Sequence, residues 1–232
     1  MIWAVVPAAG SGRRFGAGMP KQYAPIDGQP LLHWTLTRLA SVQRIEGLVV
    51  ALAADDPFWP GWPAIDGKPV RTAVGGAERV DSVLAGLREL PQAVDERDLV
   101  LVHDAARPCV RSSDIDRLID AIGERDGGLL AAPVRDTLKR QSDRPGDCAE
   151  VEATVARAGL WRALTPQAFR RGALRRALEC ALAQQQVPTD EAQAMEWNGV
   201  QPILVEGAED NIKVTTIHDL ALARFLLREQ SP

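Results

Sequence analysis

Two kinds of apolar pattern alternate along most of the chain. Short, nearly continuous apolar runs, as in 2–6 and 47–53, are typical of strands that are buried on both faces. Longer segments repeat their apolar residues every three or four positions, as at Ile115, Leu118, Ile119 and Ile122, which is typical of a helix with one buried face. Strands are expected at 2–6, 47–53, 70–74, from 98 toward Asp104, 128–134 and 200–205. Helices are expected at 30–42, 77–87, 112–124, 172–186, 189–197 and 216–227.

This order of elements indicates the fold class. Strands that alternate with helices predict an α/β protein with a mostly parallel, right-handed sheet and helices on both faces, Rossmann-like in its overall plan. The segment 55–67 is rich in proline and glycine and is expected to be an irregular loop, while 157–169 is expected to be packed. No linker or internal repeat divides the sequence, so 1–232 is interpreted as one domain.

The pattern changes between 135 and 155, where the chain becomes rich in charge. A Pro145-Gly146-Asp147 turn between two alternating stretches predicts a β-hairpin. An isolated hairpin is barely stable in water, so this arm is expected to lean on another surface, for which a second copy of the chain is the first candidate. An ordinary surface excursion is the alternative.

A glycine-rich cationic loop follows the first strand and organises the chemistry. Residues 7–23 contain four glycines, two arginines and a lysine, without an acidic residue. Glycines let backbone N–H groups approach an anion, and the cations supply the charge that a polyphosphate needs. The loop fails the P-loop pattern because Lys21 precedes Gln22, and it fails the dinucleotide fingerprint because Phe15 stands where the third glycine belongs.

Three further positions are expected at the same end of the sheet. The Gly75-Gly76 pair before a helix, with Ser82 on its first turns, offers a second set of backbone amides. Asp104 ends a central strand and is the candidate ligand of a Mg²⁺ ion, which needs only one or two carboxylates beside phosphate oxygens. Strand alternation turns His103 to the opposite face, toward the core. Lys213 follows the last strand and is expected at the edge of the site. These features together suit a nucleoside triphosphate.

Composition limits the partners. The chain has 232 residues, 46% of them hydrophobic, and its net charge of −4 does not favour bulk attraction to nucleic acid or to a membrane surface. The cysteines at 109, 148 and 180 have no metal-ligand spacing and are expected to be reduced. No apolar stretch approaches the roughly 20 residues that span a bilayer, and 2–6 is too short for a signal-peptide core, so the cytoplasm is the expected location.

Several ordered motifs together resemble the 2-C-methyl-D-erythritol 4-phosphate cytidylyltransferases, the CTP-using enzymes of the non-mevalonate isoprenoid pathway. The motifs are Pro-Ala-Ala-Gly-Ser-Gly-Arg-Arg (7–14), Pro-Lys-Gln-Tyr (20–23), Gly-Gly-x-x-Arg-x-Asp-Ser-Val (75–83), Leu-Val-His-Asp-Ala-Ala-Arg-Pro (101–108), Ala-Ala-Pro-Val-Arg-Asp-Thr-Leu-Lys (131–139), Leu-Thr-Pro-Gln (164–167), Thr-Asp-Glu (189–191) and Asp-Asn-Ile-Lys-Val-Thr (210–215). They span nearly the whole chain, whereas the first loop alone would indicate only a nucleotidyltransferase.

The resemblance implies that CTP and methylerythritol phosphate give a CDP-alcohol and pyrophosphate with Mg²⁺, in a homodimer whose 135–155 arms complete each other's sites. It implies that Arg14 and Lys21 stabilise the transition state and that Arg157 and Lys213 position the substrate phosphate. Asp104, Arg107 and Thr137 would contact substrate or metal, Thr137 from the partner chain. The residues implied to line the CTP site are Ala8, Ala9, Gly10, Gly12, Gly76 and Ser82.

Two alternatives to this function are considered. A cytidylyltransferase for another polyol phosphate, such as ribitol 5-phosphate, would share the nucleotide loop and differ in the acceptor pocket. A non-catalytic nucleotide-binding or assembly protein would bind CTP without releasing pyrophosphate. Ala77 departs from relatives with an acidic residue at this position, which affects the base preference only if that contact is made by a side chain.

Overall fold

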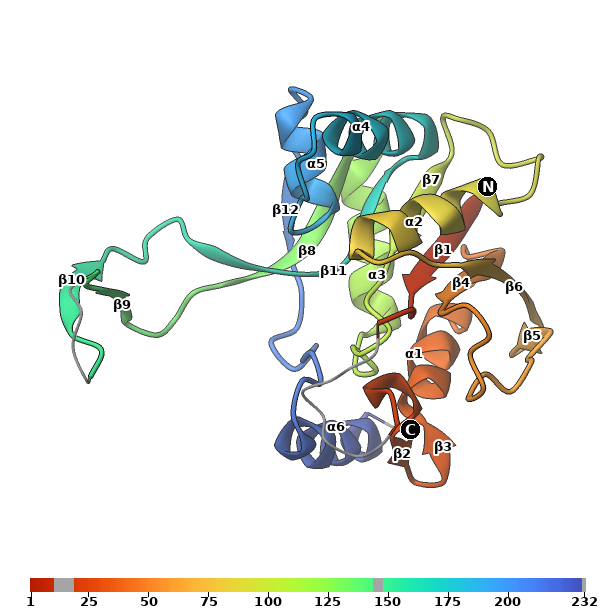
Figure 1. Ribbon diagram of the computed structural model, residues 1–232, viewed down its shortest axis with the longest axis horizontal. Helices are drawn as coiled ribbons and strands as arrows, with labels where there is room; N and C mark the ends of the chain where they lie inside the picture. The colour runs from red at the N-terminus through yellow and green to blue at the C-terminus, as the bar shows by residue number, and fades with distance from the viewer. Residues whose placement is uncertain (11–18, 144–147, 231–232) are drawn as a thin grey trace.

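The computed structural model describes residues 1–10, 19–143 and 148–230. Its centre is an eight-stranded sheet in the order β12-β8-β11-β7-β1-β4-β6-β5, and the α/β class with a mostly parallel sheet is confirmed (Figure 1). The strands of this sheet are β1 (Ile2–Pro7), β4 (Gly47–Leu52), β5 (Ala64–Ile65), β6 (Lys68–Val74), β7 (Leu99–Val102), β8 (Gly127–Pro133), β11 (Trp161–Arg170) and β12 (Ile203–Glu206). The helices are α1 (Leu31–Ala40), α2 (Arg79–Arg88), α3 (Ser112–Ile122), α4 (Arg171–Ala183), α5 (Glu191–Trp197) and α6 (Ile217–Glu229).

Helices cover both faces of the sheet because its central strands are apolar on both sides. In β1, Ala4 and Val6 face the core under α1 and α3, while Trp3 and Val5 face the core under α2, α4 and α5. The continuous apolar run of this strand therefore fills two cores at once, as the sequence predicts. A third, smaller core lies under α6, where Leu227 and Ala223 pack with Leu31.

The strand order places the ligand-binding end of the sheet. The chain leaves β1 toward β4 and β6 on one side and then returns to β7 on the other, and the pairs β1–β4, β4–β6 and β1–β7 are all parallel. In open α/β sheets, ligands bind where the strand order reverses, beyond the carboxyl ends of the strands. This point lies between Pro7 at the end of β1 and Val102 at the end of β7.

The segment 157–169 contains a strand that the sequence did not predict. β11 runs antiparallel between β7 and β8, and the pairing with β8 shifts register between Ala163 and Gln167. Pro166 lies in this irregular stretch, where a residue without an N–H removes no regular ladder bond. The proline thus marks a bulge within the strand.

The remaining elements lie outside the main sheet. A 3-10 turn, η2 (Lys21–Tyr23), precedes the short hairpin formed by β2 (Pro25–Ile26) and β3 (Gln29–Pro30), and none of these was predicted. The antiparallel pair β9 (Leu138–Gln141) and β10 (Val151–Val155) projects away from the body of the molecule (Figure 1). The predicted 145–147 turn falls within 144–147, outside the described residues. Among the described helices, none is long and apolar enough to cross a membrane.

Close packing of α2 against β1 requires a glycine. A Cβ built on Gly86 would lie 2.5 Å from Cγ1 of Val5. Overpacking of this kind costs about 1–3 kcal/mol, whereas helix propensity alone would make alanine at an exposed position about 1 kcal/mol more favourable than glycine.

We therefore expect Gly86→Ala to lower the free energy of unfolding by about 1–2 kcal/mol, measured by urea denaturation. Val5→Ala removes the methyl group that the new Cβ would meet. The double variant should accordingly be more stable than the sum of the single effects by about 1 kcal/mol or more. A stabilised Gly86→Ala variant would contradict the packing argument.

Candidate active site

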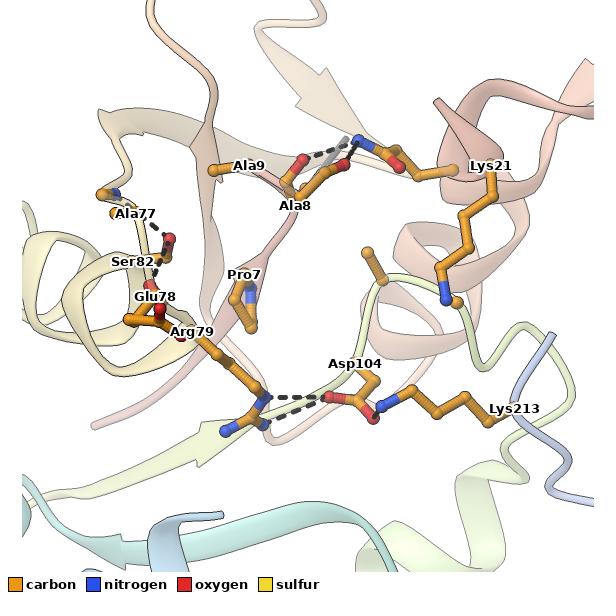
Figure 2. A pocket seen from close by; sticks show the side chains of 15 residues that line it. Pro7, Ala8, Ala9, Lys21, Ala77, Glu78, Arg79, Ser82, Asp104 and Lys213 are labelled. Atoms are coloured by element: carbon orange, nitrogen blue, oxygen red, sulfur yellow. Dashed lines mark hydrogen bonds and ion pairs between the residues drawn. The ribbon is translucent and has the colours of Figure 1, made fainter. Parts of the chain in front are cut away.

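A pocket opens where the strand order reverses, at the ends of β1 and β7 (Figure 2). It collects three separate stretches of chain: the beginning of the glycine-rich loop, the Gly-Gly turn before α2, and the segment after β7. Lys21 and Lys213 reach it from two further stretches. The lining residues are Pro7, Ala8, Ala9, Gly10, Lys21, Gln22, Gly76, Ala77, Glu78, Arg79, Ser82, Asp104, Ala105, Ala106 and Lys213.

Gln22, in the 3-10 turn η2, holds the start of the cationic loop in place. Its Nε2 donates to the carbonyl oxygens of Ala8, at 2.7 Å, and of Gly10, at 3.1 Å. Lys21 beside it donates through Nζ to the carbonyl oxygen of Val214, at 3.0 Å, so the amine lies in the pocket. Gln22 was not predicted as a site residue, because nothing in the sequence shows that its amide turns back to the end of β1. Gly12 and Arg14 lie outside the described residues.

The Gly75-Gly76 turn can pack against Ala9 and the start of α2 because neither glycine has a side chain. A Cβ on Gly75 would lie 2.6 Å from Cβ of Ala9, and one on Gly76 would lie 2.3 Å from Cβ of Asp81. Ser82 is buried and its Oγ accepts from the backbone N–H of Gly76 at 3.3 Å. Ser82 therefore supports the turn from beneath.

Asp104 is the electrostatic centre of the site. Its Oδ1 lies 3.2 Å from the Arg79 guanidinium, and its Oδ2 lies 2.9 Å from Lys213 Nζ and 3.5 Å from Arg107 Nε. Burial by itself raises the pKa of Asp104, but the positive charges of Arg79, Lys213 and Arg107 outweigh it and hold the pKa well below its usual value. The carboxylate is therefore ionised at all pH values at which the protein would work.

Arg79 and Glu191 were missed as site residues. Arg79 lies at the first position of α2, lines the pocket and contacts both Asp104 and Glu191. Glu191 lies near the start of the helix expected at 189–197, where an acidic side chain normally faces solvent, but its side chain is buried. The fixed Gly-Gly-x-x-Arg spacing was the available signal for Arg79. Glu191 stands in the Thr-Asp-Glu motif (189–191), but nothing in the sequence shows its burial or its partner, which is 112 residues away.

His103 is a core residue, as the strand alternation predicts. It is fully buried, and its Nε2 lies 3.0 Å from the carbonyl oxygen of Arg107. A carbonyl can only accept, so Nε2 carries the proton, and Nδ1 accepts from the hydroxyl of Thr165 at 3.0 Å. The same hydroxyl oxygen accepts from the backbone N–H of Asp104, which fixes the end of β7.

The structure gathers most of the predicted residues and leaves three apart from the pocket lining. Ala8, Ala9, Gly10, Lys21, Gly76, Ser82, Asp104 and Lys213 line one pocket. Arg107 is buried behind it, where it contacts Asp104 and donates to the carbonyl oxygen of Asn211 at 2.6 Å. Thr137 and Arg157 are exposed and lie at the two roots of the β9–β10 arm.

The residues suit a metal ion that arrives with a triphosphate. In the part of the chain that the structure describes, no group of three or more His, Cys, Asp or Glu side chains lies close enough to hold a metal. Asp104 and Glu78 are the carboxylates in the pocket lining. One carboxylate is enough for a Mg²⁺ ion that takes its other ligands from phosphate oxygens and water.

Comparison with known proteins gives a consistent family. The family model described as 2-C-methyl-D-erythritol 4-phosphate cytidylyltransferase matches residues 2–229. A protein of that name from Xanthomonas oryzae pv. oryzae is 56% identical over 97% of this chain and 82% of its own, and one from Xanthomonas campestris pv. campestris is 56% identical over 97% and 84%.

Solved structures of the same family also resemble this chain. The crystal structure of the Francisella tularensis enzyme of the same name is 32% identical, with a TM-score of 0.81 over 97% of this chain and 99% of the other. The Thermus thermophilus structure is 31% identical, with a TM-score of 0.76 over 97% and 98%. Both likenesses therefore extend over nearly the whole of this chain.

The buried imidazole gives a pH-dependent prediction. Burial lowers the pKa of His103 from 6.5 to about 4 in the folded chain. Above pH 6.5 both folded and unfolded chains are neutral at this residue. As the pH falls from 6.5 to about 4, only the unfolded chain takes up the proton, so the free energy of unfolding falls, by at most about 3 kcal/mol from this group.

Urea denaturation across this pH range should show the effect as a difference between the wild-type chain and His103→Gln, whose amide does not titrate and can still donate to the Arg107 carbonyl. The variant should lose less stability on acidification than the wild-type chain. Two parallel stability curves would show that the imidazole is not kept neutral by burial.

Proposed function

This chain belongs to the 2-C-methyl-D-erythritol 4-phosphate cytidylyltransferase family, and we propose that it transfers a cytidylyl group from CTP to 2-C-methyl-D-erythritol 4-phosphate. The products are 4-diphosphocytidyl-2-C-methyl-D-erythritol and pyrophosphate, in non-mevalonate isoprenoid biosynthesis. The observation that carries the proposal is the pocket at the reversal of strand order, in which the family motifs 7–10, 20–23, 75–83, 101–108 and 210–215 meet. The same observation speaks against a non-catalytic nucleotide-binding protein, which has no need of two lysines in the lining of one pocket.

The chemistry needs electrostatics more than proton transfer. The acceptor phosphate is already an oxyanion, so it can attack the α-phosphate of CTP without a general base. The barrier comes from bringing one anion onto another, and fixed cations lower it by offsetting the repulsion and stabilising the in-line geometry. Lys21 fills this role beside the cationic loop, together with Arg14, and Lys213 positions the acceptor phosphate.

Nucleotide binding is assigned to backbone groups. The amides of Ala9 and Gly10 are assigned to the phosphates, with Gly12 expected to join them, and the Gly76 turn on Ser82 is assigned to the nucleoside. Ala8 lines the pocket, but its own N–H donates to the carbonyl oxygen of Ala51 at 2.7 Å. Ala77 lies in the lining next to this turn, so its contact with the base is assigned to the backbone and CTP preference does not depend on its side chain. Mg²⁺ would be held by Asp104 and phosphate oxygens and would neutralise charge on the triphosphate.

The arm is assigned to a homodimer. The β9–β10 pair exposes the apolar side chain of Val151, at 62% exposure, and an isolated two-stranded sheet is marginal in water. A second copy would cover the arm and bring Thr137 to the site of its partner, with Arg157 at the arm's other root. The separated cysteines suit a reducing compartment, and the cytoplasm is the proposed location.

Lys21→Ala should lose roughly 3–4 kcal/mol of transition-state stabilisation, because one preorganised cation is removed from the reacting phosphates. Pyrophosphate release from CTP and methylerythritol phosphate measures the loss as kcat/KM. Lys68→Ala is the matched control, because its Nζ also donates to a backbone carbonyl, that of Gln43 at 3.2 Å, but far from the pocket. A loss below about tenfold for Lys21→Ala would reject its role.

The acceptor is tested by replacing methylerythritol phosphate with ribitol 5-phosphate in the same assay. The wild-type chain should then release little pyrophosphate.

Mixed dimers test whether Thr137 serves the partner's site. In a heterodimer of Lys21→Ala and Thr137→Ala chains, one site would carry both defects and the other neither. Equal coexpression should therefore restore about a quarter of the wild-type sites, since about half of the dimers are mixed and each has one intact site of two. Activity no higher than the mean of the two separate variants would place Thr137 in its own chain's site.

A further inference from the structure

Glu191 carries a charge into the interior of the protein. It is the first residue of α5, a position where an acidic side chain normally faces solvent, yet it is 1% exposed. A carboxylate is kept charged at such depth only if a cation and hydrogen bonds compensate for its lost hydration. Burial raises the pKa of Glu191, and the facing guanidinium of Arg79 opposes that rise.

Arg79 provides the compensation through both ends of its fork. Its Nη1 and Nη2 donate to the two carboxylate oxygens of Glu191, the latter at 3.0 Å, which is the paired geometry that makes arginine bridges strong. Its Nε donates to Oδ1 of Asp104 at 3.2 Å (Figure 2). One planar group therefore joins two carboxylates from different parts of the fold.

Glu191 is itself held in place from the sheet. Gln167 on β11 donates through Nε2 to Oδ2 of Asp190 at 2.8 Å and accepts through Oε1 from the backbone N–H of Ala192 at 2.8 Å. Asp190 also accepts from the N–H of Gln193 at 2.9 Å, which caps the helix. The residues on both sides of Glu191 are thus fixed to a central strand, and the position of its carboxylate is fixed with them.

We propose that Glu191 is a positioning residue for the transfer reaction: through Arg79 it sets the place of Asp104 relative to the beginning of α2. The inference rests on the proposed role of Asp104 in the site. Arg79 lies three residues after Gly76 and contacts the carboxylate at the reacting end, so it ties the part of the pocket assigned to the nucleoside to the part assigned to the metal and acceptor phosphate. Without Glu191, the guanidinium keeps its charge but loses the partner that orients it.

The test is Glu191→Gln, assayed with CTP and methylerythritol phosphate. Misplacement of Asp104 disturbs the transition state more than nucleotide binding, so kcat should fall about tenfold or more while the KM for CTP changes less than about threefold. Glu179→Gln is the matched control, since it removes a carboxylate that pairs with Arg175 at 3.2 Å on the exposed side of α4, and its kcat should be unchanged. A wild-type kcat for Glu191→Gln, or a change in KM alone, would overturn the proposal.

A double-mutant cycle separates this inference from the proposed function. If Glu191 acts through Asp104, Glu191→Gln should reduce kcat much less in an Asp104→Asn background than in the wild-type chain. Equal losses in both backgrounds would show that Glu191 acts independently of Asp104 and would overturn the inference, while the wild-type activity would still establish the function.

Arg79→Lys keeps the inference testable if Glu191→Gln does not fold. The lysine keeps a positive charge beside the buried Glu191, but a single ammonium group lacks the planar fork that joins both carboxylates. The same loss of kcat is expected, and full retention of kcat would again overturn the inference.

Discussion

The site depends on a buried carboxylate that holds several cations together. Positive groups repel one another, and a pocket that concentrates them for a polyanion is unfavourable until that polyanion binds. Asp104, at the end of a central strand, offsets this repulsion for Arg79, Arg107 and Lys213. Removing one partner of such a buried set leaves uncompensated charge, which is far more damaging than the net contribution of the intact pair suggests.

The sheet explains why Asp104 can hold this position. Its backbone N–H donates to the hydroxyl of Thr165 from β11, and β7, which ends two residues before it, pairs with β1 on the opposite side. A carboxylate on a loop would relax toward whichever cation was nearest. Here the backbone of Asp104 is held just beyond the end of β7, and Arg79, Lys213 and Arg107 orient its carboxylate.

Much of this could be predicted from the sequence, because local signals determine it. The apolar runs of β1, β4 and β7 identify buried strands without knowledge of their neighbours. The glycine pair at 75–76 indicates a tight turn before a helix, and the structure leaves no room there for a side chain. Motif spacing brought Lys21, Asp104 and Lys213 into one hypothesis, and the pocket lining confirms that they lie together. Their roles in catalysis remain predictions.

What the sequence missed depends on contacts between distant segments. β11 contains a proline and has no clean alternation, so only the neighbouring strands β7 and β8 reveal that it is a strand. Glu191 and Arg79 each have an ordinary surface interpretation, as a helix-start charge and a solvated arginine. Both interpretations are wrong because the two side chains form an ion pair in the interior, and burial depends on the assembled fold.

The bulge in β11 divides that strand into two parts with different freedom. Trp161 to Ala163 pairs with the end of β8 at the root of the arm, while Gln167 to Arg170 is in register with β7, deeper in the sheet. A register slip of one residue exchanges the two faces of a strand, but a bulge can absorb the slip locally. The arm can therefore lengthen or shorten among related sequences without displacing Gln167, and natural variation in chain length should concentrate on the arm side of this break.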